Sequence, residues 1–401
     1  MRRLQKTITS EYDIICFGPS DWWANNPSCC THLMKKMSVK HRILYVNPVS
    51  SDLLGTHSRK GLITRIIRKC KSLFRFYRKE ENGRIHVISP LFIPVQGVRL
   101  LDILNNIFVR LQISAVCFLL GMQHPLVWVE NIRAADFVKA YGKSIVLYHV
   151  SDRFEECPYT KNKEKLRERE REITASSDIV ICVSKELFES KKNLGKKVFY
   201  LPHGVDYDLF RQAEKSGQRY PLPFNDNKPV IGYFGTLTAQ NDIELLEYCV
   251  DHLSDMNFVF AGQITAGDYS RLLSKPNICF LGKIPYAEIP QLCAAFDVCL
   301  LPWKMNKWIE NCNPLKLKEY LASGKPIVSV PIREVAENYF NLISISDAPS
   351  SFCKSIQWEY ENDTELRKEM RIQAAAAHSW ESHIVFIEKV IQQYVKESSD
   401  L

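Results

Sequence analysis

The feature that most constrains this chain is the alternation of short apolar runs with longer amphipathic stretches along almost its whole length. The runs are rich in Val and Ile and are bounded by turn residues, as buried strands are. The predicted strands are Tyr12–Gly18, Ile43–Asn47, Ile85–Ser89, Leu126–Glu130, Ser144–Val150, Asp178–Val183, Val198–Leu201, Pro229–Gly235, Asn257–Ala261, Asn277–Leu281, Asp297–Leu301, Pro326–Val330 and Leu342–Ile345. Helical patterns lie between them, at Arg99–Leu120, Glu164–Ser176, Ile243–Leu253, Ile289–Ala295, Pro314–Ala322 and Trp380–Val395. This alternation is typical of parallel α/β sheets with helices on both faces.

The pattern stops once and then starts again. The sequence Leu-Pro-His-Gly-Val-Asp ends at Asp206, and a polar stretch with several prolines follows it. Such a stretch favours a linker. We therefore predict two α/β domains of similar size, residues 1–205 and 206–380, with a boundary near 205–228.

Composition excludes several classes of protein. The chain has 401 residues, of which 46% are hydrophobic and 24% charged, so it is neither disordered nor collagen-like. The net charge of +8 is unevenly divided: residues 1–205 hold 34 Lys and Arg against 19 Asp and Glu, whereas residues 206–401 hold 19 against 26. The 13 cysteines are scattered without a C-x2-C spacing. We expect reduced thiols in a cytoplasmic protein rather than a disulfide or metal framework.

We expect neither a membrane-spanning segment nor a secretory signal. The most apolar stretch, Leu111–Met122, has about twelve residues where a span needs about 20. The segment Ser58–Lys79 carries nine bases and no acid, with apolar residues interleaved. Two interpretations stay open: a basic helix that contacts an anionic membrane surface, and a solvated helix that packs on its own domain. No nucleic-acid-binding motif accompanies it, so we expect no nucleic acid partner.

Ligands of open parallel sheets sit at the carboxyl ends of the strands, so the residues that follow each strand are the candidates. Gly18 follows the first strand, and His149 and Asp152 lie at the end of the fifth. An imidazole close to a carboxylate there could position a hydroxyl or share a developing charge, and the alternative is a capping aspartate beside a histidine with satisfied hydrogen bonds. In the second half, the strand ends hold Gly235 with Thr236, then Gly262, then Lys283 with Ile284. Glycine loops of this kind suit phosphate or nucleobase contacts, although ordinary turns use glycine too.

The strongest stretch is Asn313-Pro314-Leu315-Lys316, followed by Glu319. Pro314 suits the first turn of a helix, and Lys316 and Glu319 lie on one side near its electropositive N-terminus. A lysine and free amides there bind an anion such as a diphosphate, and the carboxylate accepts hydrogen bonds from two hydroxyls. The stretch therefore predicts a nucleotide-sugar site; an ordinary surface pair is the alternative.

With these motifs the chain resembles retaining glycosyltransferases of the two-domain GT-B fold, similar to family 4. The resemblance rests on DIVICVSKEL, LPHGVD, IGYFGTL, NICFLGKIPYAEIPQLCAAFDVCLLP and NPLKLKEYLASGKPIVS, and spans most of residues 12–395. The chain looks most like bacterial enzymes of teichuronic acid, capsule or exopolysaccharide assembly. The resemblance implies two Rossmann-like domains that face each other across a cleft, and a helix over 381–401 that crosses back to the first domain.

The resemblance also implies a nucleoside-diphosphate-sugar donor on the second domain. The acceptor, a saccharide or a lipid-diphosphate saccharide, would lie on the first domain, with neither metal nor cofactor required. Glu319 takes the place of the ribose-binding carboxylate, Gly235 lies near the diphosphate, and Lys283 and Ile284 lie where the base is recognised. His149 and Asp152 approach the donor sugar. Transfer would occur in the cytoplasm, at the inner face of the plasma membrane.

Departures from the family pattern leave two further functions open. The first acid of the family's paired-acid motif is replaced by Asn311, and the usual diphosphate-binding bases are absent at Thr236 and at residues 241–242. We expect Lys316, Lys304 or Lys307 to supply the missing charge. The alternatives to a transferase are a nucleotide-sugar 2-epimerase of the same fold and a non-catalytic subunit that has lost donor binding.

Overall fold

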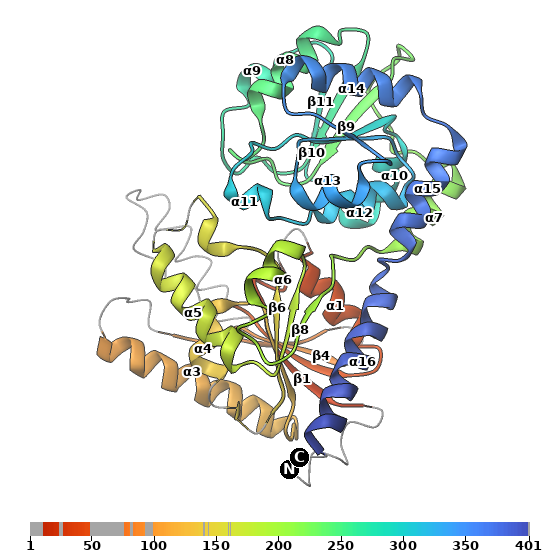
Figure 1. The fold of residues 1–401 in the computed structure, drawn as a ribbon. Helices are drawn as coiled ribbons and strands as arrows, with labels where there is room; N and C mark the ends of the chain where they lie inside the picture. Colours follow the sequence, from red (N-terminus) through yellow and green to blue (C-terminus); the bar gives the residue numbers. More distant parts are fainter. Residues whose placement is uncertain are drawn as a thin grey trace.

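The computed structural model consists of two α/β domains, each built on its own parallel sheet (Figure 1). It describes residues 11–23, 27–48, 76–80, 83–92, 99–138, 141–142, 144–158, 160 and 162–399. Most of the basic segment predicted at Ser58–Lys79, residues 58–75, lies outside these ranges.

The first domain holds an eight-stranded sheet in the order β3-β4-β2-β1-β5-β6-β7-β8. All its pairings are parallel except that of β3 with β4. Its strands are β1 Asp13–Phe17, β2 Arg42–Val46, β3 Tyr77–Lys79, β4 Ile85–Ile88, β5 Leu126–Val129, β6 Val146–Val150, β7 Ile179–Cys182 and β8 Val198–Tyr200. Its helices include α1 Cys29–Met37, α3 Arg99–Leu119, α4 Ala135–Val138, α5 Lys163–Ser176 and α6 Lys185–Lys191.

The second domain holds a six-stranded, fully parallel sheet in the order β11-β10-β9-β12-β13-β14. Its strands are β9 Val230–Phe234, β10 Asn257–Ala261, β11 Ile278–Gly282, β12 Val298–Leu301, β13 Ile327–Ser329 and β14 Ser344–Ile345. The helices from the domain junction onward include α7 Tyr207–Ser216, α8 Ile243–His252, α9 Ser270–Leu273, α10 Ile289–Ala294, α11 Lys307–Glu310, α12 Leu315–Ala322, α13 Arg333–Tyr339, α14 Pro349–Glu361, α15 Glu365–Ala376 and α16 Trp380–Ser399.

Alternation along each strand divides the core of the first domain into two layers. Ile15 and Phe17 of β1 join a cluster that includes residues of α3, α4 and α5, whereas Ile14 and Cys16 join one that includes residues of α1 and α16. Successive side chains of a strand point to opposite faces, so both layers follow from one apolar run. All thirteen predicted strands are present, and the two-domain α/β prediction is confirmed.

The structure adds elements that the pattern did not predict. The edge strand β3 has the sequence Tyr-Arg-Lys with all three residues exposed, so it carries no alternating apolar signal. Helix α7 lies inside the stretch predicted as a linker, where Phe210 packs into the core of the second domain. Helix α3 also differs from expectation: Leu100–Leu119 is long and apolar enough, by length and composition alone, to cross a membrane.

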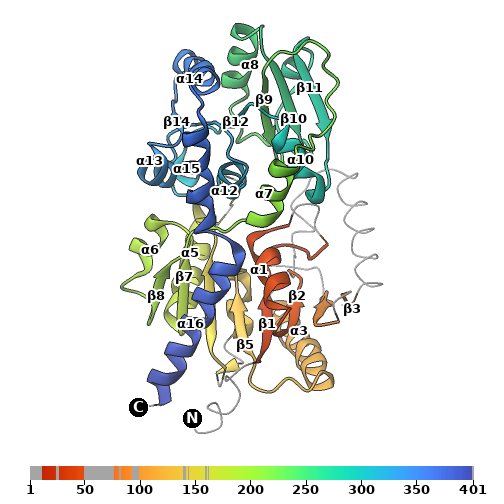
Figure 2. The same cartoon turned by 90° about the vertical axis from the view of Figure 1, so that its right-hand side faces the viewer.

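The chain passes between the domains twice, at adjacent points. The Val205 amide donates to the carbonyl of His378 over 2.9 Å, and the Trp380 amide donates to the Val205 carbonyl over 3.1 Å. Helix α16 then descends along the first domain beside α1, as both views show (Figures 1 and 2). Charged contacts hold it there, among them the ion pair of Lys40 with Glu388 at 3.0 Å.

Imidazoles gathered at this crossing make stability depend on pH. Burial lowers the pKa of His203 and His378 to about 3 and of His383 to about 4. The unfolded chain therefore binds more protons than the folded chain below about pH 6.5, the ordinary pKa of histidine. Burial raises the pKa of Asp152 to about 6 and also raises the pKa of Glu155, Glu319 and Glu359, and these four carboxyl groups act in the opposite sense. Burial lowers the pKa of His41 and His86 as well, which adds to the effect of the three histidines at the crossing.

We predict that the melting temperature falls steadily between about pH 7 and about pH 5, before ordinary carboxylates become protonated. The His383→Gln variant should lose less stability over this interval than the wild-type protein. The exposed His252 offers a matched control, because His252→Gln should keep the wild-type slope. Equal slopes for all three proteins in a thermal melt would contradict this account.

Candidate functional site

A cavity of about 390 Å³ lies between the two domains. Its walls come from the carboxyl ends of β6 and β9, from the loops after β10 and β11, and from α11, α12 and the start of α16. Eleven of the thirteen residues predicted for the site line it: Asp152, Gly235, Thr236, Gly262, Lys283, Ile284, Asn313, Pro314, Leu315, Lys316 and Glu319. Residues far apart in the sequence thus meet at the place that the strand-end argument selects.

The glycines of the second domain form the floor of this cavity. Gly235 and Gly262 have φ angles of +129° and +142°, and a Cβ atom on Gly262 would lie 1.9 Å from the Gly235 carbonyl oxygen. The Gly235 amide donates to the Ala261 carbonyl over 2.8 Å, and the Gly262 amide to the Gly282 carbonyl over 2.6 Å. Only glycine allows this contact between loops, so their backbone lies open to a ligand.

Lys316 extends over this floor from the first turn of α12. A Cβ atom on Gly235 would lie 2.1 Å from its Cε atom. Its ammonium group lies 5.5 Å from the ring centre of Tyr233 and 5.6 Å from that of Trp303. No side chain caps the N-terminus of α12. Free amides, the helix dipole and a lysine therefore face the same cavity, which suits an anionic group.

Glu319 lies one turn farther along α12 on the same side. Burial raises the pKa of its carboxyl group, against the opposing charges of Lys316 and His32 and a hydrogen bond from Tyr286. A carboxylate enclosed in this way gains from accepting hydrogen bonds from ligand hydroxyls. Lys304 and Lys307, the other lysines considered for the anion, are exposed and do not line the cavity.

The first domain contributes Asp152 and His203 to the opposite wall. Asp152 accepts a hydrogen bond from Trp308 Nε1 across the cleft over 2.7 Å. Burial raises the pKa of Asp152 to about 6, although this bond and one from the Arg153 amide oppose the shift. His203 Nδ1, Asn241 Nδ2 and Asn313 Oδ1 are buried and have no hydrogen-bond partner within the described part of the chain. Such atoms in a cavity wall are positions for ligand contacts.

Gly18 and His149 do not line the cavity. A Cβ atom on Gly18 would collide with the Tyr45 ring, so packing explains that glycine. His149 is buried in β6, where its Nδ1 atom pairs with Glu130. Among the described residues, Cys29, Glu130 and His149 form the one group placed to hold a metal ion. The fit is poor, because Glu130 already pairs with the imidazole and burial raises the pKa of the Cys29 thiol well above its usual value.

His32, Tyr286 and Trp308 also line the cavity, and sequence reasoning missed them. His32 Nδ1 lies 3.2 Å from Asp206 Oδ2, and its ring stacks on Trp380 at 5.3 Å. These contacts join residues remote in sequence, so no local spacing indicates them. Asp206, the partner of His32, is the last residue of the LPHGVD motif, and this motif is the signal in the sequence that points to this part of the cavity.

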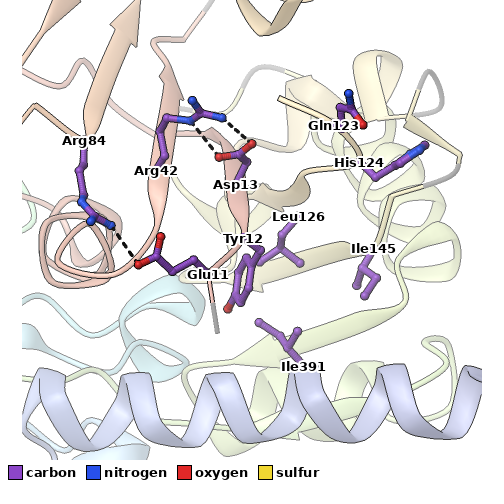
Figure 3. Close-up of a pocket in the computed structure, with 10 residues that line it drawn as sticks. All are labelled: Glu11, Tyr12, Asp13, Arg42, Arg84, Gln123, His124, Leu126, Ile145 and Ile391. Carbon is purple, nitrogen blue, oxygen red and sulfur yellow. Dashed lines mark hydrogen bonds and ion pairs between the residues drawn. The ribbon is translucent and has the colours of Figure 1, made fainter. Parts of the chain in front are cut away.

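A second cavity, also of about 390 Å³, lies at the amino ends of the first domain's strands (Figure 3). Its charged groups pair with one another: Arg42 binds Asp13 through two hydrogen bonds of 2.8 and 2.9 Å, and Arg84 lies 3.8 Å from Glu11. It contains none of the predicted site residues. We therefore assign the candidate active site to the cavity between the domains.

Comparison with known proteins agrees with this geometry. Residues 228–362 match the family model "Glycosyl transferases group 1". The second domain is therefore similar to group 1 glycosyltransferase domains. A Bacillus subtilis protein named "Putative teichuronic acid biosynthesis glycosyltransferase TuaH" is 28% identical over 226 residues. That match covers 54% of this chain and 55% of the relative, so the chain spans about half the length of this relative.

The likeness to solved structures extends beyond residues 228–362 to the whole fold. Sucrose-phosphate synthase from Thermosynechococcus elongatus aligns with a TM-score of 0.71 at 13% identity, over 96% of this chain and 100% of that chain. A glycosyltransferase from Rickettsia africae aligns at 0.64 with 15% identity, over 96% and 99%. Anabaena HepE in complex with UDP and glucose aligns at 0.61 with 14% identity, over 96% and 99%. The expected GT-B fold is confirmed.

We predict that Gly262→Ala destabilises the protein far more than Gly121→Ala does. Both glycines have positive φ, but only the Gly262 methyl group would strike backbone, since nothing lies within 4 Å of a Cβ atom on Gly121. The difference in unfolding free energy should be about 1–3 kcal/mol, the cost of an overpacked position. Chemical denaturation measures both variants, and equal losses would mean that the two loops can separate.

Proposed function

We propose that the protein transfers a sugar from a nucleoside-diphosphate sugar to a saccharide acceptor in the synthesis of a cell-surface polysaccharide. The observation that carries this proposal is the joint position of Lys316, Glu319 and the open glycine floor in one cavity. The diphosphate would lie at the N-terminus of α12 beside Lys316, and the ribose hydroxyls against Glu319. The base would lie near Lys283 and Ile284.

The proposed chemistry needs no metal or organic cofactor. Lys316 and the amides of α12 stabilise the negative charge that grows on the departing diphosphate. The sugar would face Asp152 and His203 of the first domain. His203 is a neutral imidazole above about pH 3, so it can hydrogen-bond a sugar hydroxyl. We propose retention of the anomeric configuration, which NMR of the product tests directly.

We propose a uridine nucleotide sugar as the donor and a lipid-linked saccharide as the acceptor. The HepE structures contain UDP or UDP-glucose, so uridine nucleotides are the first donors to test. The likeness to the B. subtilis relative supports a polysaccharide acceptor, which we propose is lipid-linked. The twelve cysteines of the described residues are all free thiols, in agreement with transfer on the cytoplasmic side of the plasma membrane.

Lys316→Ala and Glu319→Ala should each weaken nucleotide-sugar binding by about tenfold to a hundredfold, since each removes a charged hydrogen-bonding partner worth about 1.5–3 kcal/mol. Lys304→Ala is the matched control, because Lys304 is exposed and outside the cavity wall. Titration calorimetry with UDP, GDP and ADP measures these affinities. Wild-type affinity in both site variants would refute the assignment.

One incubation separates the three candidate functions. Purified protein is mixed with the nucleotide sugar that binds best, with and without a saccharide acceptor. A transferase releases the nucleoside diphosphate rapidly only when the acceptor is present. A 2-epimerase converts the donor without any acceptor, whereas a non-catalytic subunit binds none of the nucleotides. Either of the last two results would overturn the proposal.

A further inference from the structure

Helix α3 is apolar on two opposite faces. Val109, Ile113 and Val116 lie on the inner face and are buried in the core of the first domain. The outer face exposes eight large apolar side chains at helical spacing: Leu100, Ile103, Leu104, Ile107, Phe108, Leu111, Phe118 and Leu119. Phe118 and Leu119 are 84% and 81% exposed. A helix that only covers its own sheet has a polar outer face.

Exposed apolar side chains are far more concentrated on α3 than on the rest of the described molecule. Nineteen large apolar side chains are exposed among the described residues, and eight of them lie on α3. Single exposed apolar residues need no explanation, but a continuous patch marks a place of contact. At about 1.5 Å per residue, the helix is about 30 Å long, so the patch forms a long stripe.

The helix lies on the outer side of the first domain, away from the second domain (Figure 1). Its length and composition would allow it to cross a membrane, with a mean hydropathy of 1.4 over its apolar part. Crossing, however, would pull Val109, Ile113 and Val116 out of the core. The arrangement instead suits a helix that lies flat, with only its outer face in an apolar environment.

Two observations favour lipid over protein as the occupant. Among the exposed residues of Leu100–Leu119, Asp102 and Ser114 are the two polar side chains, whereas protein interfaces carry about one hydrogen bond per 100–200 Å². Arg110 is turned aside, since it donates to the carbonyl of Asp136. The sequence that leads into α3 and through it is also basic: residues 51–110 carry 12 Lys and Arg against four Asp and Glu, a net charge that attracts anionic lipid headgroups.

We propose that the outer face of α3 is the surface by which this protein docks flat on an anionic lipid bilayer. The apolar stripe would enter the boundary between headgroups and acyl chains, while the cleft between the domains stays in water. The proposal does not rest on the sugar chemistry, because vesicle binding is measured without donor or acceptor. It would, however, hold the acceptor side of the protein at the membrane.

Flotation of the full chain with vesicles tests the proposal. We expect the protein to float with vesicles of equal parts phosphatidylglycerol and phosphatidylethanolamine, and more weakly with pure phosphatidylcholine. For the triple variant Ile107→Ser, Leu111→Ser, Phe118→Ser, the partition coefficient onto the vesicles should fall by about tenfold or more, because the variant lacks three apolar side chains of the stripe. The charge of the chain is unchanged, so such a loss is not electrostatic.

The matched control carries Phe340→Ser, Leu366→Ser and Val385→Ser, three exposed apolar side chains away from α3. It should float like the wild-type protein. Circular dichroism and nucleotide binding report whether each variant is folded. A second readout uses Phe118→Trp, whose fluorescence should be quenched by lipids brominated on the acyl chains.

Flotation of the α3 variant at the wild-type level would overturn the proposal, as would an unquenched tryptophan at position 118 in bound protein. A protein occupant gives a different result. If the wild-type chain does not float but is a dimer by sedimentation, and the α3 variant is a monomer, the stripe is an interface between copies. Failure of either kind leaves the sugar-transfer proposal intact.

Discussion

The candidate site depends on a contact between two backbones. The carbonyl of Gly235 occupies the position that a side chain at residue 262 would need. The Lys316 side chain occupies the position that a side chain at residue 235 would need. Because neither loop carries a side chain there, β9 and β10 end side by side, and the Gly235 and Gly262 amides donate to the carbonyls of Ala261 and Gly282. Lys316 extends its positive charge over these loops from the first turn of α12. In water such a charge binds a phosphate weakly, but in an enclosed cavity the attraction is stronger.

The walls of the cavity are fixed by bonds between the domains. Trp308 reaches Asp152, and the Asn313 amide donates to the carbonyl of Val183 over 2.7 Å. Burial alone would raise the pKa of Asp206, but contacts with His32 and Lys36 outweigh it and lower that pKa. Each of these contacts joins a residue of the first domain to a residue that follows Val205, where the chain first passes to the second domain. The same groups therefore hold the domains together and shape the space for a ligand.

Local patterns predicted the strands and the glycine-ended loops because period, apolarity and turn residues are all local. Lys316 and Glu319 were predicted because both lie on one short helix. His32 and Trp308 escaped because their significance comes from partners more than 150 residues away. The strand β3 escaped because it is exposed and charged. The exposed apolar face of α3 was not predicted for another reason. The sequence shows that the helix is apolar on two faces, but it does not show whether protein or lipid contacts the second face.

The two halves of the chain meet different electrostatic demands. A donor diphosphate needs little bulk charge if Lys316 and helix amides are held in place, and the second half is acidic overall. The first half carries a surplus of bases in its sequence, and although salt screens single charges, a cluster of them still attracts an anionic surface. A fixed orientation of the protein on such a surface needs apolar contacts as well, because attraction to the headgroups alone does not determine which face of the protein meets the bilayer. The stripe on α3 supplies that second element, so charge and apolar area together define one way to lie on a bilayer.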